Sequence, residues 1–109
     1  MKTTLELHER TLFIRPGEDL DHHNAEYIRI QSDEFLEKYP VNKVVFDFTG
    51  VEFMDSSGIG VVMGRYKQMQ YAGGEVYVYG IGKSVDRIFQ MSGLYRLVRE
   101  YQPEREGGY

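Results

Sequence analysis

Residues 44–67 constrain the fold of this chain more than any other segment. They open with a short apolar, β-prone run in which Asp47 is the only charge, and such a run predicts a strand covered on both faces. The sequence D-S-S-G follows at residues 55–58, and the side chains of its first three residues can accept hydrogen bonds from the open N–H groups of a helix. We therefore expect a buried strand, a short loop and a helix that begins within these four residues.

The expected helix is apolar on one side and rich in glycine near its start. Gly58, Gly60 and Gly64 lie in its first turns, where each interior glycine costs about 1 kcal/mol relative to alanine. We expect this cost to be offset by close packing on the sheet or by close approach of another molecule to the helix N-terminus. Apolar residues recur at three- and four-residue steps and predict a single stripe. The stripe consists of Ile59, Val62, Met63, Tyr66 and Met69.

The two serines at the start of this helix allow two interpretations. Serine before an apolar helical run is an ordinary helix cap, and composition and spacing alone favour that role for Ser56 and Ser57. Exposed serines at the positive end of a helix are also well placed to carry a phosphate, so either residue could act as a switch. The rest of the chain has to decide between the two interpretations.

Composition limits the classes of protein to which the chain can belong. Its net charge is −4, from 17 acidic and 13 basic residues, and the basic residues form no single block, so nucleic acid is not an expected partner. The absence of cysteine excludes disulfides, thiolate metal sites and thiol catalysis. Because we find neither an apolar signal region at the N-terminus nor a run of membrane-spanning length, we expect no membrane association and a cytoplasmic location.

The order of the expected elements is ββαβαβαβ, which predicts an α/β domain. A polar turn at Glu9-Arg10 makes the first two strands an antiparallel hairpin. Later repeats of strand, helix and strand predict parallel strands joined by right-handed crossovers. We expect one domain with a mixed sheet over residues 1–102 and a short polar tail over residues 103–109. Strands are expected over residues 3–9, 11–15, 44–48, 75–79 and 94–100, and helices over residues 22–39, 55–72 and 83–92.

Two catalytic or metal-binding interpretations have weaker support. Asp55 and the serines, combined with His22 or His23, could suggest a serine hydrolase, but the spacing G-x-S-x-G is absent and no oxyanion donor pair is indicated. The adjacent histidines could also suggest a metal site. Because neighbouring side chains at a helix start point in different directions, solvated imidazoles are the favoured interpretation, and no metal ligand is assigned.

Three motifs resemble those of the STAS domain anti-sigma factor antagonists. They are L-D-H-H-N-A-E at residues 20–26, F-M-D-S-S-G-I-G at residues 53–60 with G-R-Y-K-Q at residues 64–68, and F-Q-M-S-G-L at residues 89–94. The resemblance extends from about residue 5 to residue 99 without a gap. The segments L-D-H-H, G-R-Y-K-Q and M-S-G-L are similar to the sporulation branch of the family, which acts in the sigma-F pathway.

The resemblance implies a bacterial binding protein that is not an enzyme and is built as a single STAS-type domain. Its relatives bind an anti-sigma factor that is also a serine kinase, and so release a sporulation sigma factor. The kinase uses ATP to phosphorylate the serine that directly follows the aspartate, which inactivates the antagonist, and a serine phosphatase restores it. No cofactor of the antagonist itself is implied. An antagonist in a general stress or other sigma-factor system is the alternative within the family.

On the same resemblance, the phosphorylated residue is Ser56. Its phosphate would add about −1.5 to −2 charge beside Asp55, within a surface that a partner must desolvate. We therefore expect phosphorylation to prevent binding without a large change of fold, and the glycines to let a kinase active site reach the helix start. The implied partner-binding residues are Asp19, Asp21, Asp55, Ser57, Gly58, Ile59 and Gly60.

Overall fold

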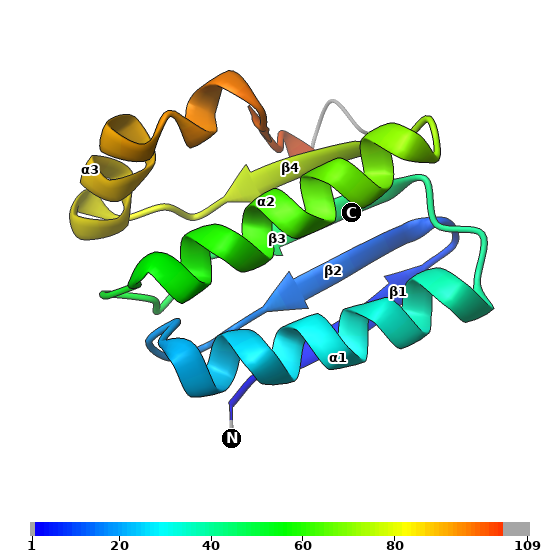
Figure 1. Cartoon of the computed structure of the whole chain (residues 1–109), viewed down its shortest axis with the longest axis horizontal. Helices are drawn as coiled ribbons and strands as arrows, with labels where there is room; N and C mark the ends of the chain where they lie inside the picture. Colours follow the sequence, from blue (N-terminus) through cyan, green and yellow to red (C-terminus); the bar gives the residue numbers. More distant parts are fainter. Residues whose placement is uncertain (1, 104–109) are drawn as a thin grey trace.

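Strands and helices alternate along residues 2–103, the part of the chain that the computed structural model describes (Figure 1). The elements are β1 (Thr4–His8), β2 (Thr11–Arg15), α1 (His22–Lys38), β3 (Lys43–Asp47), α2 (Ser56–Tyr71), β4 (Glu75–Tyr79), α3 (Lys83–Ser92), a 3₁₀ helix η1 (Leu94–Arg96) and β5 (Arg99–Glu100). The strands form one sheet in the order β1-β2-β3-β4-β5. β1 and β2 are antiparallel, and the other neighbours are parallel. The predicted mixed sheet with an N-terminal hairpin is confirmed.

The three α-helices cover one face of the sheet. The parallel strands advance in one direction across the sheet, and right-handed crossovers then place every connecting helix on the same side. Figure 1 shows α1 and α2 lying in front of the strands. Alternate strand residues form the core beneath the helices: Leu12, Ile14, Val44, Phe46, Val76 and Val78. The intervening residues Phe13, Val45 and Tyr77 form a second buried cluster with Tyr101 on the opposite face.

β3 is buried on both faces, as its apolar run predicted. Its one charged residue within that run, Asp47, is only 7% exposed and ends the strand. Arg15 donates from Nε to the Asp47 carboxylate at 2.9 Å, and the main-chain N–H of Thr49 donates to it at 3.0 Å. Burial opposes ionisation of Asp47, but the hydrogen bonds from Thr49 and Arg15 outweigh it and hold the pKa of this carboxyl below its ordinary value.

The strand expected over residues 94–100 is mostly wrong, because only Arg99–Glu100 pairs with β4. Gly93 ends α3 in the left-handed conformation, with φ 78°, and the next three residues turn into the helix η1. Leu94 and Val98, which are four residues apart, are both buried in the core. Helical spacing of apolar residues therefore overrides the β propensity of this segment until the chain reaches the sheet edge.

A buried arginine joins α1 to α2. Arg65 is 5% exposed, and its Nη1 donates to the Ser32 hydroxyl at 2.6 Å. Its Nη2 lies 3.0 Å from Oδ1 of Asp33, while burial lowers the pKa of the Arg65 guanidinium. The predicted apolar stripe includes Val62 and Met69, which are buried, but the hydrophobic pattern gave no sign that an arginine shares this face.

Two expectations concern the ends of the chain and the membrane. The polar tail predicted over residues 103–109 lies outside the described residues, except for its first residue. Between residues 2 and 103, no helix is both long enough and apolar enough to cross a membrane.

Candidate functional site

The N-termini of α1 and α2 lie side by side at the end of the sheet where β2 and β3 stop. The main chain of Leu20 joins the two preceding loops, because its N–H donates to the Phe53 carbonyl at 2.9 Å and its carbonyl accepts from Asp55 N–H at 3.4 Å. Leu20 and Met54 form an isolated parallel bridge. The loops that follow β2 and β3 are thus hydrogen-bonded to each other, and they bring both helix starts onto one surface.

Aspartates, and not serines, cap the two helices. Oδ1 of Asp55 accepts from Ser57 N–H at 2.8 Å, and Asp55 is the N-cap residue of α2. Oδ1 of Asp21 accepts from Asn24 N–H at 3.0 Å at the start of α1. The interpretation of Ser56 and Ser57 as ordinary caps is therefore wrong, since the aspartate takes that role. Neither serine hydroxyl is needed to begin the helix.

The two adjacent serines have different environments. Ser57 is half-buried, and its hydroxyl lies 3.1 Å from Nδ1 of His22, the first residue of α1. Ser56 is exposed at the first position of α2, and within residues 2–103 its hydroxyl has no hydrogen-bond partner. The structure therefore holds one serine within the protein and presents the other to solvent.

The glycines of α2 also have different roles. A methyl group on Gly58 would lie 3.0 Å from the Leu20 carbonyl oxygen and 3.1 Å from Cβ of Met54, so this glycine packs closely, but against the two loops and not on the sheet as predicted. A methyl group on Gly60 or Gly64 would meet nothing within 4 Å. These two glycines border a groove of about 220 Å³ between α1 and α2. Internal packing therefore does not explain them.

The remaining predicted site residues lie around these two helix starts. Asp19 is exposed, and its carbonyl accepts from the Asn24 side chain at 2.7 Å, which fixes the loop before α1. Asp21 and Asp55 are half-buried, and Ile59 packs partly against the core. Gly58 is buried, so of the predicted residues it is the one that lies beneath the surface.

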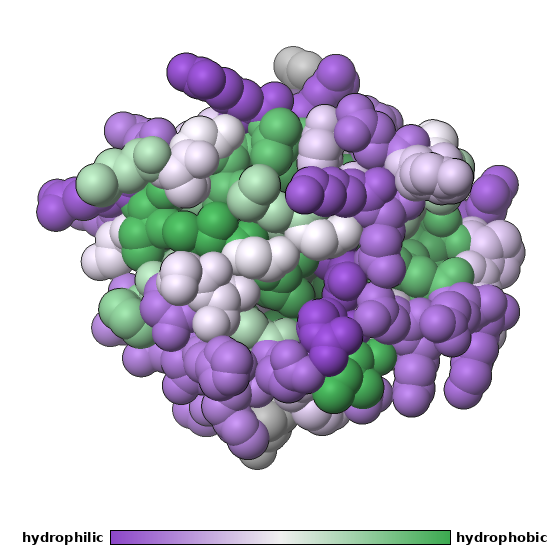
Figure 2. Space-filling model, in the orientation of Figure 1, coloured by the Kyte–Doolittle hydropathy of each residue, from purple (hydrophilic) through white to green (hydrophobic). Residues whose placement is uncertain are grey.

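Apolar surface adjoins the helix start, and of its residues only Ile59 was predicted to bind a partner. Figure 2 shows hydrophobic side chains gathered between α2 and α3, whereas the outer side of α1 is mostly hydrophilic. Ile59, Met63 and Ile88 are partly buried apolar residues of these two helices. Phe53 is 49% exposed in the loop before Ser56. A large apolar side chain in an exposed loop was the available signal for Phe53.

The arrangement around Ser57 does not support hydrolase chemistry. The N–H groups of Ser57, Gly58 and Ile59 all donate to Asp55, so none of them is free to stabilise an oxyanion. The nearest acidic residue on the same face of α1 as His22 is Glu26, one turn away, and its two carboxylate oxygens accept from Arg29 at 2.6 and 3.3 Å. Among the residues described, no group of three or more acidic or histidine side chains is placed to bind a metal ion.

Comparison with known proteins places the whole described domain in one family. The STAS domain matches residues 2–107. The anti-sigma F factor antagonist of Paenibacillus polymyxa is 36% identical over 104 residues, which cover 95% of this chain and 89% of the relative. The anti-sigma-B factor antagonist of Listeria monocytogenes is 28% identical over 112 residues, which cover 97% of this chain and 95% of the relative.

Solved structures show the same fold in two modification states. The unphosphorylated form of the anti-sigma factor antagonist SpoIIAA is 28% identical, with a TM-score of 0.76 over 95% of this chain and 92% of that one. The phosphorylated form of the Bacillus cell fate determinant SpoIIAA is 30% identical, with a TM-score of 0.76 over 95% of each chain.

Proposed function

This chain belongs to the STAS domain family, and we propose that it acts as a bacterial anti-sigma factor antagonist that phosphorylation of Ser56 inactivates. In this proposal the unmodified protein binds an anti-sigma factor that is also a serine kinase, and thereby releases a sigma factor. The kinase supplies ATP as the phosphate donor, and a separate serine phosphatase removes the phosphate. The chain itself performs no catalysis and needs no cofactor.

The observation that carries the proposal is the difference between the adjacent serines. A kinase must place the hydroxyl that it modifies in line with the γ-phosphate of ATP, so it needs an accessible residue. Ser56 is exposed at the first position of α2, whereas the Ser57 hydroxyl contacts His22. The local geometry therefore favours Ser56 as the acceptor.

The proposed docking surface consists of the paired loops and the apolar residues beside them. Asp19, Asp21 and Asp55 supply negative charge, and Phe53 and Ile59 supply apolar area that a partner can bury. Interfaces commonly combine an apolar centre with a polar rim. We therefore expect a partner surface that carries basic residues around an apolar pocket.

The proposed inactivation is electrostatic. A phosphate on Ser56 adds about −1.5 to −2 charge beside Asp55, and a partner would have to desolvate both groups. The positive N-terminal end of α2 stabilises the modified residue within the protein. The equal TM-scores of 0.76 to the unphosphorylated and phosphorylated SpoIIAA structures support a mechanism that does not refold the domain.

The released sigma factor is proposed to be of the sporulation type. Identity to the anti-sigma F factor antagonist of Paenibacillus polymyxa is 36%, compared with 28% to the anti-sigma-B factor antagonist of Listeria monocytogenes. A general stress system is the second candidate because the match to the latter covers 97% of this chain. To separate these candidates, the protein is added to a sporulation and to a general stress complex of sigma factor and anti-sigma factor. Each anti-sigma factor is then pulled down, and the complex that has lost its sigma factor identifies the system.

Phosphate mapping tests the residue assignment. We expect the wild-type protein, incubated with its cognate anti-sigma kinase and ATP, to gain one phosphate, which peptide mass spectrometry locates on Ser56. Ser57→Ala is the matched control and should gain the same phosphate, whereas Ser56→Ala should gain none. A phosphate on Ser57 of the wild-type protein, or no phosphate at all, would contradict the assignment.

A further inference from the structure

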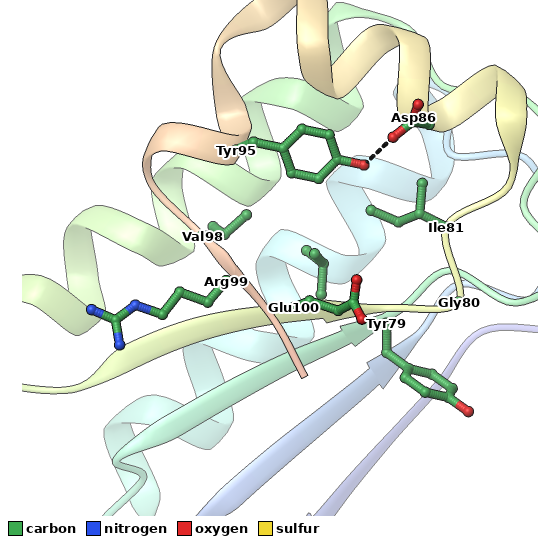
Figure 3. A pocket seen from close by; sticks show the side chains of 9 residues that line it. Tyr79, Gly80, Ile81, Asp86, Tyr95, Val98, Arg99 and Glu100 are labelled. Carbon is green, nitrogen blue, oxygen red and sulfur yellow. Dashed lines mark hydrogen bonds between the residues drawn. The ribbon is translucent and has the colours of Figure 1, made fainter. Parts of the chain in front are cut away.

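A cavity of about 650 Å³ lies between β4, α3 and the segment that enters β5 (Figure 3). Val78 and Val98 line it and are buried, and Ile81 lines it from the loop between β4 and α3. None of its lining residues belongs to the loops that carry Ser56. The cavity is therefore a feature separate from the proposed phosphorylation site.

Two carboxylates face this cavity from different elements. Asp86 of α3 accepts from the Tyr95 hydroxyl at 2.6 Å and from the Gln90 side chain at 2.8 Å. Glu100 of β5 lies across the cavity from the Tyr95 and Asp86 pair (Figure 3). In the part of the chain that the structure describes, the Glu100 carboxylate has neither a hydrogen bond nor an ion pair.

Among the described residues that line the cavity, Arg99 carries the one positive charge. Its guanidinium points away from Glu100 in Figure 3 and lies 3.8 Å from Glu75. Burial, the hydrogen bond to Asp86 and the charges of Asp86 and Glu100 together raise the pKa of Tyr95 to about 12. The phenol therefore stays protonated at neutral pH and keeps donating to Asp86.

We propose that this cavity binds an organic cation carried on an apolar stem, namely an alkylguanidinium or alkylammonium group. Glu100 and Asp86 accept hydrogen bonds from the cationic head, and charge-assisted bonds of this kind are the strong ones. Val78, Ile81 and Val98 contact the stem, as apolar walls do in most small-molecule sites. The cation can come from an arginine or lysine side chain of another protein or from a free amine.

Titration with small cations, followed by amide NMR shifts of the full chain, tests this proposal. The probes are N-acetyl-arginine amide, its neutral isostere N-acetyl-citrulline amide, and n-butylamine. We expect the arginine probe to shift the amides of residues 79–81 and 98–100 and the citrulline probe to leave them in place. If butylamine binds as well as the arginine probe, a free amine suffices. If only the arginine probe binds, the site is selective for a guanidinium head.

Glu100→Gln is the variant that removes the unpaired charge, and it sits at an exposed strand end where folding should be unaffected. We expect it to weaken binding of the arginine probe about tenfold, which corresponds to ~1.4 kcal/mol. Glu37→Gln on the exposed side of α1 removes the same charge elsewhere and should leave the affinity unchanged. Equal affinity of Glu100→Gln and wild type, equal shifts with citrulline, or no localised shift with either cation would overturn the proposal.

Discussion

Ser56 and Ser57 are neighbours in the sequence, but the structure gives their hydroxyl groups different surroundings. Asp55 caps the helix through Ser57 N–H, and His22 contacts the Ser57 hydroxyl at 3.1 Å. Ser56 is left exposed at the positive end of α2. Contacts with neighbouring residues thus distinguish two side chains that are chemically identical.

A permanent negative charge at Ser56 should mimic the modified state. We expect Ser56→Asp to weaken binding of the anti-sigma factor at least about tenfold, because like charges brought together at an interface cost several kcal/mol. The fold should be kept, since an acidic residue stabilises a helix N-terminus by about 0.3–1 kcal/mol. Isothermal titration calorimetry measures the affinity directly.

Ser84→Asp is the matched control for that variant. Ser84 is exposed in the first turn of α3, so the substitution makes the same change in net charge in a similar helix position. We expect its affinity to equal that of the wild type. Equal weakening by both substitutions would mean that net charge, and not charge at the docking surface, governs binding.

The start of α2 combines a glycine that packing requires with two glycines that packing does not require. Gly58 packs against Leu20 and Met54, and a methyl group added at Gly58 would come within 3.0–3.1 Å of their atoms. Gly60 and Gly64 border the open groove beside α1. Such glycines lower the stability of a helix, which is consistent with the proposed approach of a partner to this surface.

Alanine substitutions should separate these two kinds of glycine. We expect Gly58→Ala to destabilise the protein by about 1–3 kcal/mol, because overpacking shifts the neighbouring loop. Gly60→Ala should stabilise it by up to about 1 kcal/mol, because alanine favours the helix and meets no neighbour. Urea unfolding measures both changes.

The same variants test the role of the groove in binding. If partner approach explains Gly60, Gly60→Ala should be the more stable protein and still bind the anti-sigma factor more weakly than the wild type. Unchanged affinity of this stabilised variant would remove partner contact as the reason for glycine at this position.

Most elements could be predicted from the sequence because their signals are local. The apolar run of β3, the stripe of α2 and the glycine after α3 are each visible in a few residues, and the structure confirms them. η1 was missed because strand and helix patterns are hard to separate over so short a segment. The Arg65 to Ser32 bond was missed because it joins residues 33 positions apart, and no local pattern pairs them.

The residues of the candidate site could be named from the sequence, but the contacts between them could not. The positions around D-S-S-G were identified from a family resemblance, and the pairing of the two loops could not be read from either loop alone. The contact of His22 with Ser57 spans 35 residues and depends on how α1 and α2 pack. Phe53 lies within the motif at residues 53–60, but its exposure could not be read from that motif.

At the scale of the whole molecule, a partly buried ion pair joins the hairpin to the centre of the sheet. Arg15 of β2 and Asp47 of β3 lie 2.9 Å apart, and Asp47 also accepts from Thr49 at the start of the loop that leads to the site. Because the side chain of Asp47 is only 11% exposed, loss of its charge affects both the sheet and this loop.

Stability should fall in acid partly through Asp47. Its pKa is lowered in the folded protein, so its contribution is fully present above the unfolded value of about 3.9 and is lost as the pH falls through the lower folded value. We expect Asp47→Asn to be less stable than wild type at neutral pH and to show a shallower loss of stability in acid. Urea unfolding from about pH 7 to about pH 2 measures both slopes. Parallel curves for the two proteins would assign the acid sensitivity to other groups.

The release of a sigma factor from its anti-sigma kinase tests the proposed switch most directly. A preformed complex of the two is titrated with the unmodified protein and, separately, with protein fully phosphorylated on Ser56, and free sigma factor is measured. The switch predicts release by the unmodified protein and at least about tenfold less release by the phosphorylated protein, which corresponds to ~1.4 kcal/mol or more of lost binding free energy. Equal release by the two forms would contradict it.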